Sequence, residues 1–341
     1  MKLIRILLSL VFLVLILFII GCAPSSYFTN KPYKETQFLM DTIIEITAYG
    51  PNREAGVKAA FEEFKRIQKL SDHFNPESQV SKINQMAGVR PVEVDAELIE
   101  MVTLAHEISE KTEGAFDISI GPLTELWGIG HKSNFVPTQQ EIDKVLPLVD
   151  YRKIQVDTAK NTIFLPLPGM KLDLGGVAKD YALNKSASVL REYGITSALI
   201  NAGGDIEVVG NKPDDTPWRI GVQDPRDSEK VIAKFSLSPW NTSQTSGDYQ
   251  RFFVKDNICY AHIIDPRTGR QPTELASVTL VYTSSDSYVS GDVASSGFMV
   301  LGLDKAMAAL HAFPGVEAVF ITTDGRVVIS PNLNHSVELS H

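Results

Sequence analysis

The stretch Lys171-Leu-Asp-Leu-Gly-Gly-Val-Ala-Lys-Asp180 contains the signals of a strand, a turn and a helix in immediate succession. Residues 171–174 predict the end of a short strand, the two glycines allow a close turn, and residues 177–193 predict a helix. A glycine turn into a helix N-terminus presents free N–H groups and the positive end of the helix dipole. This arrangement suits a phosphate, with Lys179 as a nearby charge. Alternatively, the glycines serve only tight packing.

This turn matches neither of the two common nucleotide-binding patterns. Its glycine spacing is not GxGxxG and not GxxxxGK[ST]. The sequence therefore supports neither a Rossmann dinucleotide site nor a P-loop.

A second polar segment, His262-Ile-Ile-Asp-Pro-Arg-Thr-Gly269, follows a predicted strand. Pro266 fixes the backbone before a turn that Gly269 can close, so the polar side chains should project from a rigid loop. Two interpretations remain open: a functional loop, or a surface turn with a salt bridge between Asp265 and Arg267. Likewise, His262 with an ordinary pKa of about 6.5 could accept a proton at neutral pH, or it could be a structural histidine beside Asp265.

A third segment, Ser290-Gly-Asp-Val-Ala-Ser-Ser296, precedes an apolar helical pattern. Asp292 and Ser296 are four residues apart, which places a carboxylate and a hydroxyl on one helix face. Carboxylate, hydroxyl and backbone carbonyl oxygens are hard ligands that suit Mg²⁺. The alternative is that Ser290 or Asp292 only caps the helix.

Taken in order along the chain, these segments resemble the ApbE family, the FAD:protein FMN transferases. The resemblance extends from about Met40 to Gly302. Its further landmarks are Met40-Asp-Thr42, Phe74-Asn-Pro-Glu-Ser78, Gly114-Ala-Phe-Asp117, Gly121-Pro-Leu123, Leu126-Trp-Gly128, Asn201-Ala-Gly-Gly-Asp205 and Thr245-Ser-Gly-Asp-Tyr249.

The resemblance implies an enzyme that uses FAD as a substrate and Mg²⁺ as a cofactor. FMN would be attached through a phosphoester to a threonine of an acceptor protein, with release of AMP. His262 would be the catalytic base and Asp292 a catalytic metal ligand. The implied metal site comprises the Ala178 carbonyl, Asp292, Ser295 and Ser296. The implied FAD site comprises Met40, Phe74, Ala115, Phe116, Asp117, Asp173, Gly175, Lys179, Tyr181, Ile264 and Asp265.

Some positions differ from the usual family pattern. Ser296 stands where threonine is usual, Val293 where a small alanine is usual, and Asp180 where glycine is common. Serine retains the hydroxyl ligand, so the metal site is expected to remain.

The N-terminal sequence predicts a location outside the cytoplasm. Lys2 and Arg5 precede an apolar run over residues 6–20, and the segment Ile19-Ile-Gly-Cys22 follows, which together resemble a bacterial lipoprotein signal with its lipobox. We expect residues 1–21 to be a signal peptide, 22–34 a lipid-anchored linker, and 35–335 the catalytic domain. The chain would then be a membrane-anchored lipoprotein facing the periplasm or extracytoplasmic side. The alternative is an uncleaved anchor helix with the same orientation.

Charge and cysteine content restrict the partners. The net charge is −9 and no basic cluster appears, which argues against nucleic acid. Lipidation of Cys22 would leave Cys259 as the remaining thiol and exclude an internal disulfide. Cys259 is predicted to be a small hydrophobe in a buried strand.

Hydrophobic spacing predicts an α+β fold with mixed, mostly antiparallel sheets. Helices are predicted over residues 53–70 and 96–110. Phe38, Ile43, Ile44 and Ile46 are expected to begin the core. The resemblance implies two intimately packed halves with exchanged strands. Predicted strands cover residues 162–165, 197–200, 206–209, 218–222, 232–237 and 277–282, with a closing hairpin over 316–329.

Two other functions remain possible besides transfer. The same site could hydrolyse FAD to FMN and AMP, since water needs no pocket of its own. Alternatively, the chain could be a surface lipoprotein that only binds flavin. The expected partners of the transferase are FAD and acceptor flavoprotein subunits, such as extracytoplasmic subunits of sodium-pumping or electron-transfer complexes.

Overall fold

The computed structural model describes residues 31–130, 132, 134–238, 241–283 and 294–340. Residues 32–341 form one compact unit, to which all the elements below belong. The predicted lipidation site Cys22 and the predicted metal ligand Asp292 both lie outside the described residues. Within the described part of the chain, no helix is both long and apolar enough to cross a membrane.

An eight-stranded sheet forms the centre of this unit, and all of its neighbouring strands are antiparallel wherever pairing is described. The α+β prediction with mostly antiparallel strands is therefore confirmed. The two inner strands β13 and β14 are buried along their whole length, so both faces of the sheet must be covered. In spatial order the strands are β1 (Tyr33–Leu39), β2 (Thr42–Tyr49), β6 (Ser197–Ala202), β7 (Asp205–Val209), β10 (Thr242–Gly247), β13 (Leu275–Tyr282), β14 (Glu317–Thr322) and β15 (Val327–Ile329).

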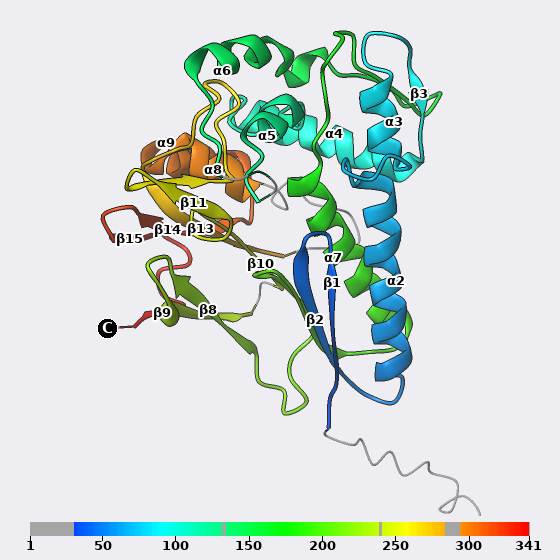
Figure 1. Cartoon of the computed structure of the whole chain (residues 1–341). Coiled ribbons are helices and arrows are strands. Elements are labelled where there is room, and N and C mark those ends of the chain that lie inside the picture. The colour runs from blue at the N-terminus through cyan, green and yellow to red at the C-terminus, as the bar shows by residue number, and fades with distance from the viewer. Residues whose placement is uncertain (1–30, 131, 133, 239–240, 284–293, 341) are drawn as a thin grey trace, which may run out of the picture. The chain divides into compact units, whose positions relative to one another are not determined.

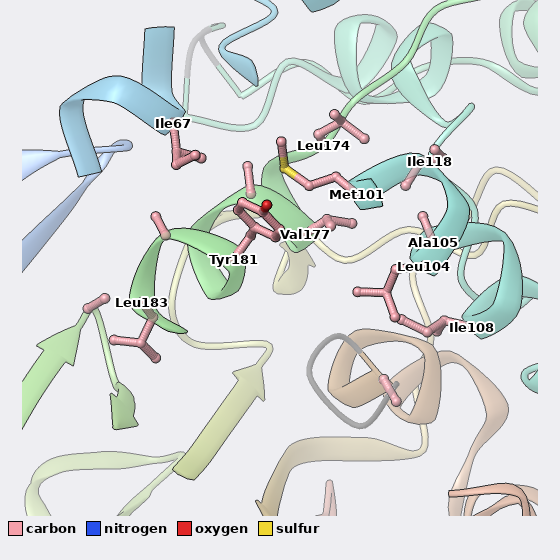
Figure 2. Packing of buried hydrophobic residues seen from close by; sticks show 14 of the residues in the cluster. Ile67, Met101, Leu104, Ala105, Ile108, Ile118, Leu174, Val177, Tyr181 and Leu183 are labelled. Carbon is pink, nitrogen blue, oxygen red and sulfur yellow. The ribbon is translucent and has the colours of Figure 1, made fainter. Parts of the chain in front are cut away.

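Helices cover one face of the sheet. Helix α2 (Arg53–Ser71) lies beside α7 (Gly175–Glu192), and both contact the first strands of the sheet (Figure 1). Their apolar stripes join that of α4 (Ala96–Lys111), whose Met101 lies near Val177 at the start of α7 (Figure 2). The three helices predicted from the sequence are therefore confirmed. Helix α7 begins two residues before its predicted start.

A small sheet covers the other face. It consists of β16 (Val337–Leu339), β9 (Asp227–Leu237) and β8 (Trp218–Asp224), in that order. Trp218 and Phe235 from this sheet pack with Val281 and Val319 of the central sheet. The neighbouring Leu280 belongs instead to the cluster on the helical side, which is the alternation expected of a strand buried on both faces.

The remaining elements surround this three-layered centre. Strands β3 (Val92–Glu93), β5 (Thr162–Phe164) and β4 (Gln155–Asp157) form a small sheet, and β11 (Phe252–Lys255) pairs with β12 (Ile258–Ala261). The other helices are α3 (Gln79–Gln85), α5 (Gly121–Trp127), α6 (Gln139–Val145), α8 (Ala294–Leu301) and α9 (Leu303–Ala309).

Three local predictions are wrong. Residues 171–174 form no strand; Lys171 makes only an isolated bridge to Ile120. Phe38 and Ile43 do not begin the core, because they are 70% and 62% exposed, whereas Ile44 and Ile46 are fully buried. Cys259 lies in a strand as predicted, but that strand is exposed.

The segment before α7 is held by individual hydrogen bonds instead of a sheet. The Asn84 amide donates to the Leu172 carbonyl at 3.0 Å, and the Leu172 N–H donates to Asn84 Oδ1 at 2.7 Å. The Asp173 N–H donates to the Ile118 carbonyl at 2.8 Å. These bonds replace a strand ladder and fix the direction in which the chain enters α7.

Gly121 allows α5 to start directly against this segment. A β-carbon there would lie 2.7 Å from Lys171 Cβ and 2.8 Å from the Lys171 carbonyl oxygen. Alanine is favoured over glycine in an isolated helix, but this overlap should exceed that gain. We expect Gly121→Ala to lower the free energy of unfolding by about 1–3 kcal/mol in chemical denaturation.

A matched control is Gly176→Ala in the first turn of α7. A β-carbon at Gly176 would lie 3.4 Å from the Phe116 ring, which is an ordinary contact. We expect this variant to change the free energy of unfolding by less than about 1 kcal/mol. Equal losses in the two variants would contradict the steric explanation.

Candidate active site

The turn at the start of α7 is open to solvent. Gly175 and Gly176 are exposed, while Val177 and Ala178 behind them are buried. Asp173 Oδ1 accepts the Gly175 N–H at 2.9 Å, and the Val177 and Ala178 N–H groups donate to the Leu174 carbonyl. The predicted helix N-terminus is therefore present and accessible, although Asp173 already uses one of its donors. This use would leave Asp173 as a positioning group of the turn.

Phe116 brings the first turns of α7 and α8 together. Its ring would lie 3.4 Å from a β-carbon on Gly176, and its own β-carbon 3.1 Å from one on Gly297 of α8. The Phe116 side chain is buried, as is Ala115 beside it. Three segments that are far apart in sequence thus meet at one side chain.

The predicted metal ligands among the described residues lie at the starts of these two helices. Ala178 is buried in the first turn of α7, Ser295 is buried at the start of α8, and Ser296 beside it is partly exposed. Ser295 Oγ is 2.8 Å from Ser246 Oγ, a bond that ties α8 to β10. Carbonyl and hydroxyl oxygens fit a hard cation such as Mg²⁺. Among the described residues there is no cluster of three or more His, Cys, Asp or Glu side chains suited to a metal.

Lys179 is held by an acidic partner. Its ammonium forms an ion pair with Asp205, which is buried at the start of β7. The other oxygen, Asp205 Oδ1, accepts the Thr245 N–H at 2.9 Å. The coulombic attraction of Asp205 raises the pKa of Lys179 against the opposing effect of burial. Lys179 therefore remains a fixed positive charge near the start of α7.

His262 follows β12 and lies near this positive charge. The backbone N–H of His262 donates to the Arg251 carbonyl at 3.0 Å. The imidazole Nδ1 is buried without a hydrogen-bond partner among the described residues. Burial lowers the pKa of His262 to about 3, with further lowering by Arg251 and Lys179. The expected ordinary pKa is therefore wrong for the ligand-free chain, and the imidazole is neutral at neutral pH.

This shift makes stability depend on pH. The unfolded chain binds a proton at His262 below about pH 6.5, whereas the folded chain does so only near pH 3. Stability due to neutral His262 is therefore full above the unfolded pKa and is lost as pH falls toward the folded one. We expect wild type to lose up to about 2 kcal/mol more than His262→Gln between pH 7 and pH 5 in urea unfolding. Equal losses would contradict the buried neutral imidazole.

An exposed aromatic side chain flanks the α7 turn. Phe74 is exposed, and its ring centroid is 4.0 Å from that of His73. His73 Nδ1 is 3.5 Å from Asp173 Oδ1, so the aromatic pair adjoins the glycine turn. This position suits a planar ring of a ligand whose phosphates lie at α7.

Met40 reaches the same region from the β1–β2 turn. Met40 and Asp41 both have left-handed φ angles of 52° and 57°, as a two-residue hairpin turn requires. The Met40 N–H donates to Gln68 Oε1 at 3.1 Å, and Asp41 Oδ2 accepts from Arg251 Nη1 at 2.8 Å. Arg251 thus connects this turn to His262, because the Arg251 carbonyl also accepts the backbone N–H of His262.

Two predicted FAD ligands have their polar groups occupied inside the protein. Asp117 is buried; its oxygens accept from the Ser119 N–H, the Ser119 hydroxyl and the Tyr151 N–H at 2.6–2.9 Å. Burial nevertheless raises the pKa of Asp117. Tyr181 is buried on α7, and its hydroxyl donates to Glu100 at 2.7 Å. Both residues therefore stabilise the framework of the site through hydrogen bonds inside the protein.

The loop after His262 has a mainly structural geometry. Ile264 packs with Leu123, Trp127 and Ile142 in a separate apolar cluster. Asp265 forms a two-pronged ion pair with Arg267 at 2.8 and 2.9 Å, which is the surface-turn alternative considered for this segment. Functional and structural interpretations thus apply to different ends of the same segment.

Sequence patterns missed Arg251 and the pairing role of Asp205. Asp205 follows a glycine pair in one of the family landmarks, which was a usable signal. Arg251 lies in no such landmark, and only the fold brings it near His262 and Asp41.

Comparison with known proteins identifies the family of this chain. The model of the ApbE family matches residues 40–320. A protein named FAD:protein FMN transferase from Klebsiella pneumoniae is 33% identical over 303 residues, covering 88% of this chain and 92% of its own. A protein of the same name from Treponema pallidum is 32% identical, with 89% and 88% coverage.

Solved structures show the same fold. The ApbE protein of Thermotoga maritima matches with a TM-score of 0.82 and 31% identity, covering 90% of this chain and 99% of its own. The flavin transferase ApbE of Vibrio cholerae matches with a TM-score of 0.79 and 25% identity, covering 90% and 100%. The match of fold, motif order and sequence over most of the chain shows that this protein belongs to the ApbE family.

Proposed function

We propose that this chain transfers FMN from FAD to a threonine hydroxyl of an acceptor protein. The observation that carries the proposal is the position of neutral His262 beside the fixed cations Arg251 and Lys179, near the open start of α7. A neutral imidazole can accept a proton, and the cations can hold a pyrophosphate. Family membership and the names of the relatives support FAD as the substrate.

The proposed reaction is one phosphoryl transfer. The threonine oxygen attacks the phosphorus of the FMN half, and the bond from that phosphorus to the bridging oxygen breaks. AMP leaves with the bonding electrons, and the hydroxyl proton passes to the His262 imidazole. In such reactions the protein mainly positions the reactants and neutralises charge. The α7 turn, Lys179 and Arg251 would do both.

Substrate binding should also adjust the base. Arg251 and Lys179 are among the causes of the low pKa of His262, after burial. The negative pyrophosphate would offset both charges and raise that pKa toward its ordinary value. His262 would then be a stronger base in the complex than in the free enzyme.

The proposed cofactor is Mg²⁺. Asp292, the Ala178 carbonyl and the hydroxyls of Ser295 and Ser296 would hold it; when bound, it would neutralise phosphate charge. The described donors are neutral oxygens, so the charge of the site would come from Asp292.

The proposed location is the extracytoplasmic side of a membrane, through lipid on Cys22. The basic residues, apolar run and cysteine of the N-terminal sequence support this address. A metabolic label with radioactive palmitate should mark the full chain, and Cys22→Ser should remove the label. Labelling that persists in Cys22→Ser would contradict the lipid anchor.

The transfer reaction can be tested directly. The enzyme starting at Ala23 is incubated with FAD, Mg²⁺ and the flavin-free extracytoplasmic domain of a sodium-pumping electron-transfer complex from the same organism. An FMN mass increase on the acceptor with equal release of AMP is expected. AMP and free FMN without adduct would instead indicate hydrolysis, and FAD that is bound but intact would indicate a flavin-binding protein.

A further inference from the structure

The hairpin of β11 and β12 has two open edges. These strands pair only with each other within the described part of the chain. Asp256 and Asn257 form its two-residue turn, with left-handed φ angles of 52° and 61°. An isolated hairpin with free edges is marginally stable by itself and needs support from packing.

One face of the hairpin supplies that support. Phe253 stacks on Tyr260 with ring centroids 5.2 Å apart, and Tyr260 lies 5.7 Å from the ring of Trp127. Trp127 is buried, and its indole N–H donates to the Gly269 carbonyl at 2.9 Å. The hairpin is therefore anchored to the loop that follows His262.

The opposite face remains apolar and exposed. Phe252 is 50% exposed and Val254 is 55% exposed. Cys259 lies directly across from Val254 and is also exposed. Because side chains alternate along a strand, these three residues share the face opposite Phe253 and Tyr260.

The outer edge of β11 also presents backbone groups that pair with no strand in the described part of the chain. The bond from the His262 N–H to the Arg251 carbonyl makes these two residues a hydrogen-bonded pair. In an antiparallel ladder such pairs alternate with non-bonded ones, so the N–H and C=O groups of Phe252 and Val254 point away from β12. Such an edge is a template for another strand.

This surface leads directly to the proposed base. Arg251 and His262 form the last hydrogen-bonded pair at the open end of the hairpin. Arg251 also forms an ion pair with Asp41 of the β1–β2 turn. Beside that turn, Phe38 and Ile43 lie opposite each other and both are exposed. One ion pair thus joins the two hairpins beside the proposed site of transfer, and each hairpin exposes apolar side chains.

We propose that an extended, apolar segment of the flavin acceptor protein pairs with β11 as a third strand. The proposal rests on the proposed transfer function, which requires a protein hydroxyl to reach His262. Strand addition would supply backbone hydrogen bonds, and Phe252 and Val254 would contact alternate apolar side chains of the segment. A chain that continues past Phe252 along this edge approaches Arg251 and the proposed base.

The position of the surface favours the acceptor over other occupants. A second copy of this chain or a lipid surface on β11 would stand beside His262 and obstruct the approach of the acceptor. The acceptor is the macromolecule that the reaction itself brings to this place.

Two variants test side chains and backbone separately. The double variant Phe252→Ser with Val254→Ser removes the apolar contacts. Val254→Pro removes an outward N–H and no bond between β11 and β12. With the sodium-pump domain as acceptor, we expect each to raise its KM about tenfold or more, while kcat at saturation stays within about twofold. FAD affinity, read from flavin fluorescence, should not change.

The matched control is Leu339→Ser. Leu339 is an exposed apolar residue on β16, which is also an edge strand. Its acceptor KM should equal that of wild type. An unchanged KM in either test variant would overturn the proposal, as would a wild-type dimer that the double variant dissociates, or binding to phosphatidylglycerol vesicles that the double variant loses without an effect on KM.

The exposed thiol provides an independent measurement. In the enzyme starting at Ala23, Cys259 is the remaining cysteine and lies across from Val254. Saturating acceptor should slow maleimide labelling of Cys259 about tenfold or more, and undiminished labelling would overturn the proposal. Absence of any adduct with wild-type enzyme would instead be a failure of the proposed transfer function, and is therefore measured first.

Discussion

Replacing His262 with glutamine is expected to lower the rate of FMN transfer by about 10²–10⁴-fold, the usual contribution of a positioned general base. Glutamine is close in size to histidine and neutral, so the buried space around Nδ1 should remain filled. Because Lys179 and the α7 turn are unchanged, FAD affinity should stay within about threefold. Single-turnover measurements of acceptor flavinylation and flavin fluorescence titrations give the two quantities.

His106→Gln is the matched control for this variant. His106 lies on α4, has a buried Nε2 without a hydrogen-bond partner among the described residues, and has a pKa lowered by burial. It resembles His262 in environment but has no place in the proposed reaction. We expect transfer within about threefold of wild type in the control. Similar losses in both variants would show that His262 acts through folding and is not the base.

The local spacing of apolar residues was sufficient to predict the helices that bury one face. The stripes Val57, Phe61 and Phe64 on α2 and Leu98, Met101 and Ala105 on α4 are buried as predicted. Helical periodicity identifies such faces because each turn must bury the same side. Lengths and types of these elements therefore followed from the sequence alone.

The exposure of apolar side chains could not be predicted where a strand extends beyond the helices or sheets that cover its other residues. Phe38 and Ile43 have the composition of a buried strand, yet they lie opposite each other at the exposed end of the β1–β2 hairpin. Cys259 likewise lies in an apolar strand whose outer face has no covering element among the described residues. Strand propensity reports a half-buried surface without stating which half is covered.

Motif resemblance predicted the neighbours in the site better than their electrostatics. It associated the α7 turn with Phe116, and Gly176 of that turn does lie next to the Phe116 ring. It gave no sign that burial and Arg251 would lower the pKa of His262. Charges from distant segments determine a pKa, and their distances exist only after folding.

Replacing Asp292 with alanine is expected to have the other large effect. Asp292 is the proposed carboxylate ligand of Mg²⁺, and the other proposed ligands, including Ala178 and Ser296, are neutral oxygens. Loss of the only anionic ligand should abolish tight metal binding and slow transfer by at least about 10²–10³-fold, while flavin binding weakens much less. Transfer rates over a Mg²⁺ titration, with and without chelator, measure the effect.

Two further variants separate metal binding from general damage. Ser296→Ala removes one neutral ligand, so it should raise the Mg²⁺ concentration needed for half-maximal rate but reach a similar maximum. Asp324→Ala removes an exposed carboxylate in the β14–β15 turn, where Asp324 pairs only with its neighbours Thr322 and Arg326 in the described structure, and should leave the titration unchanged. Full activity in Asp292→Ala would remove the charged ligand from the proposed site. The cations Arg251 and Lys179 would then have to neutralise the pyrophosphate without a metal, which would change the mechanism at its most highly charged step.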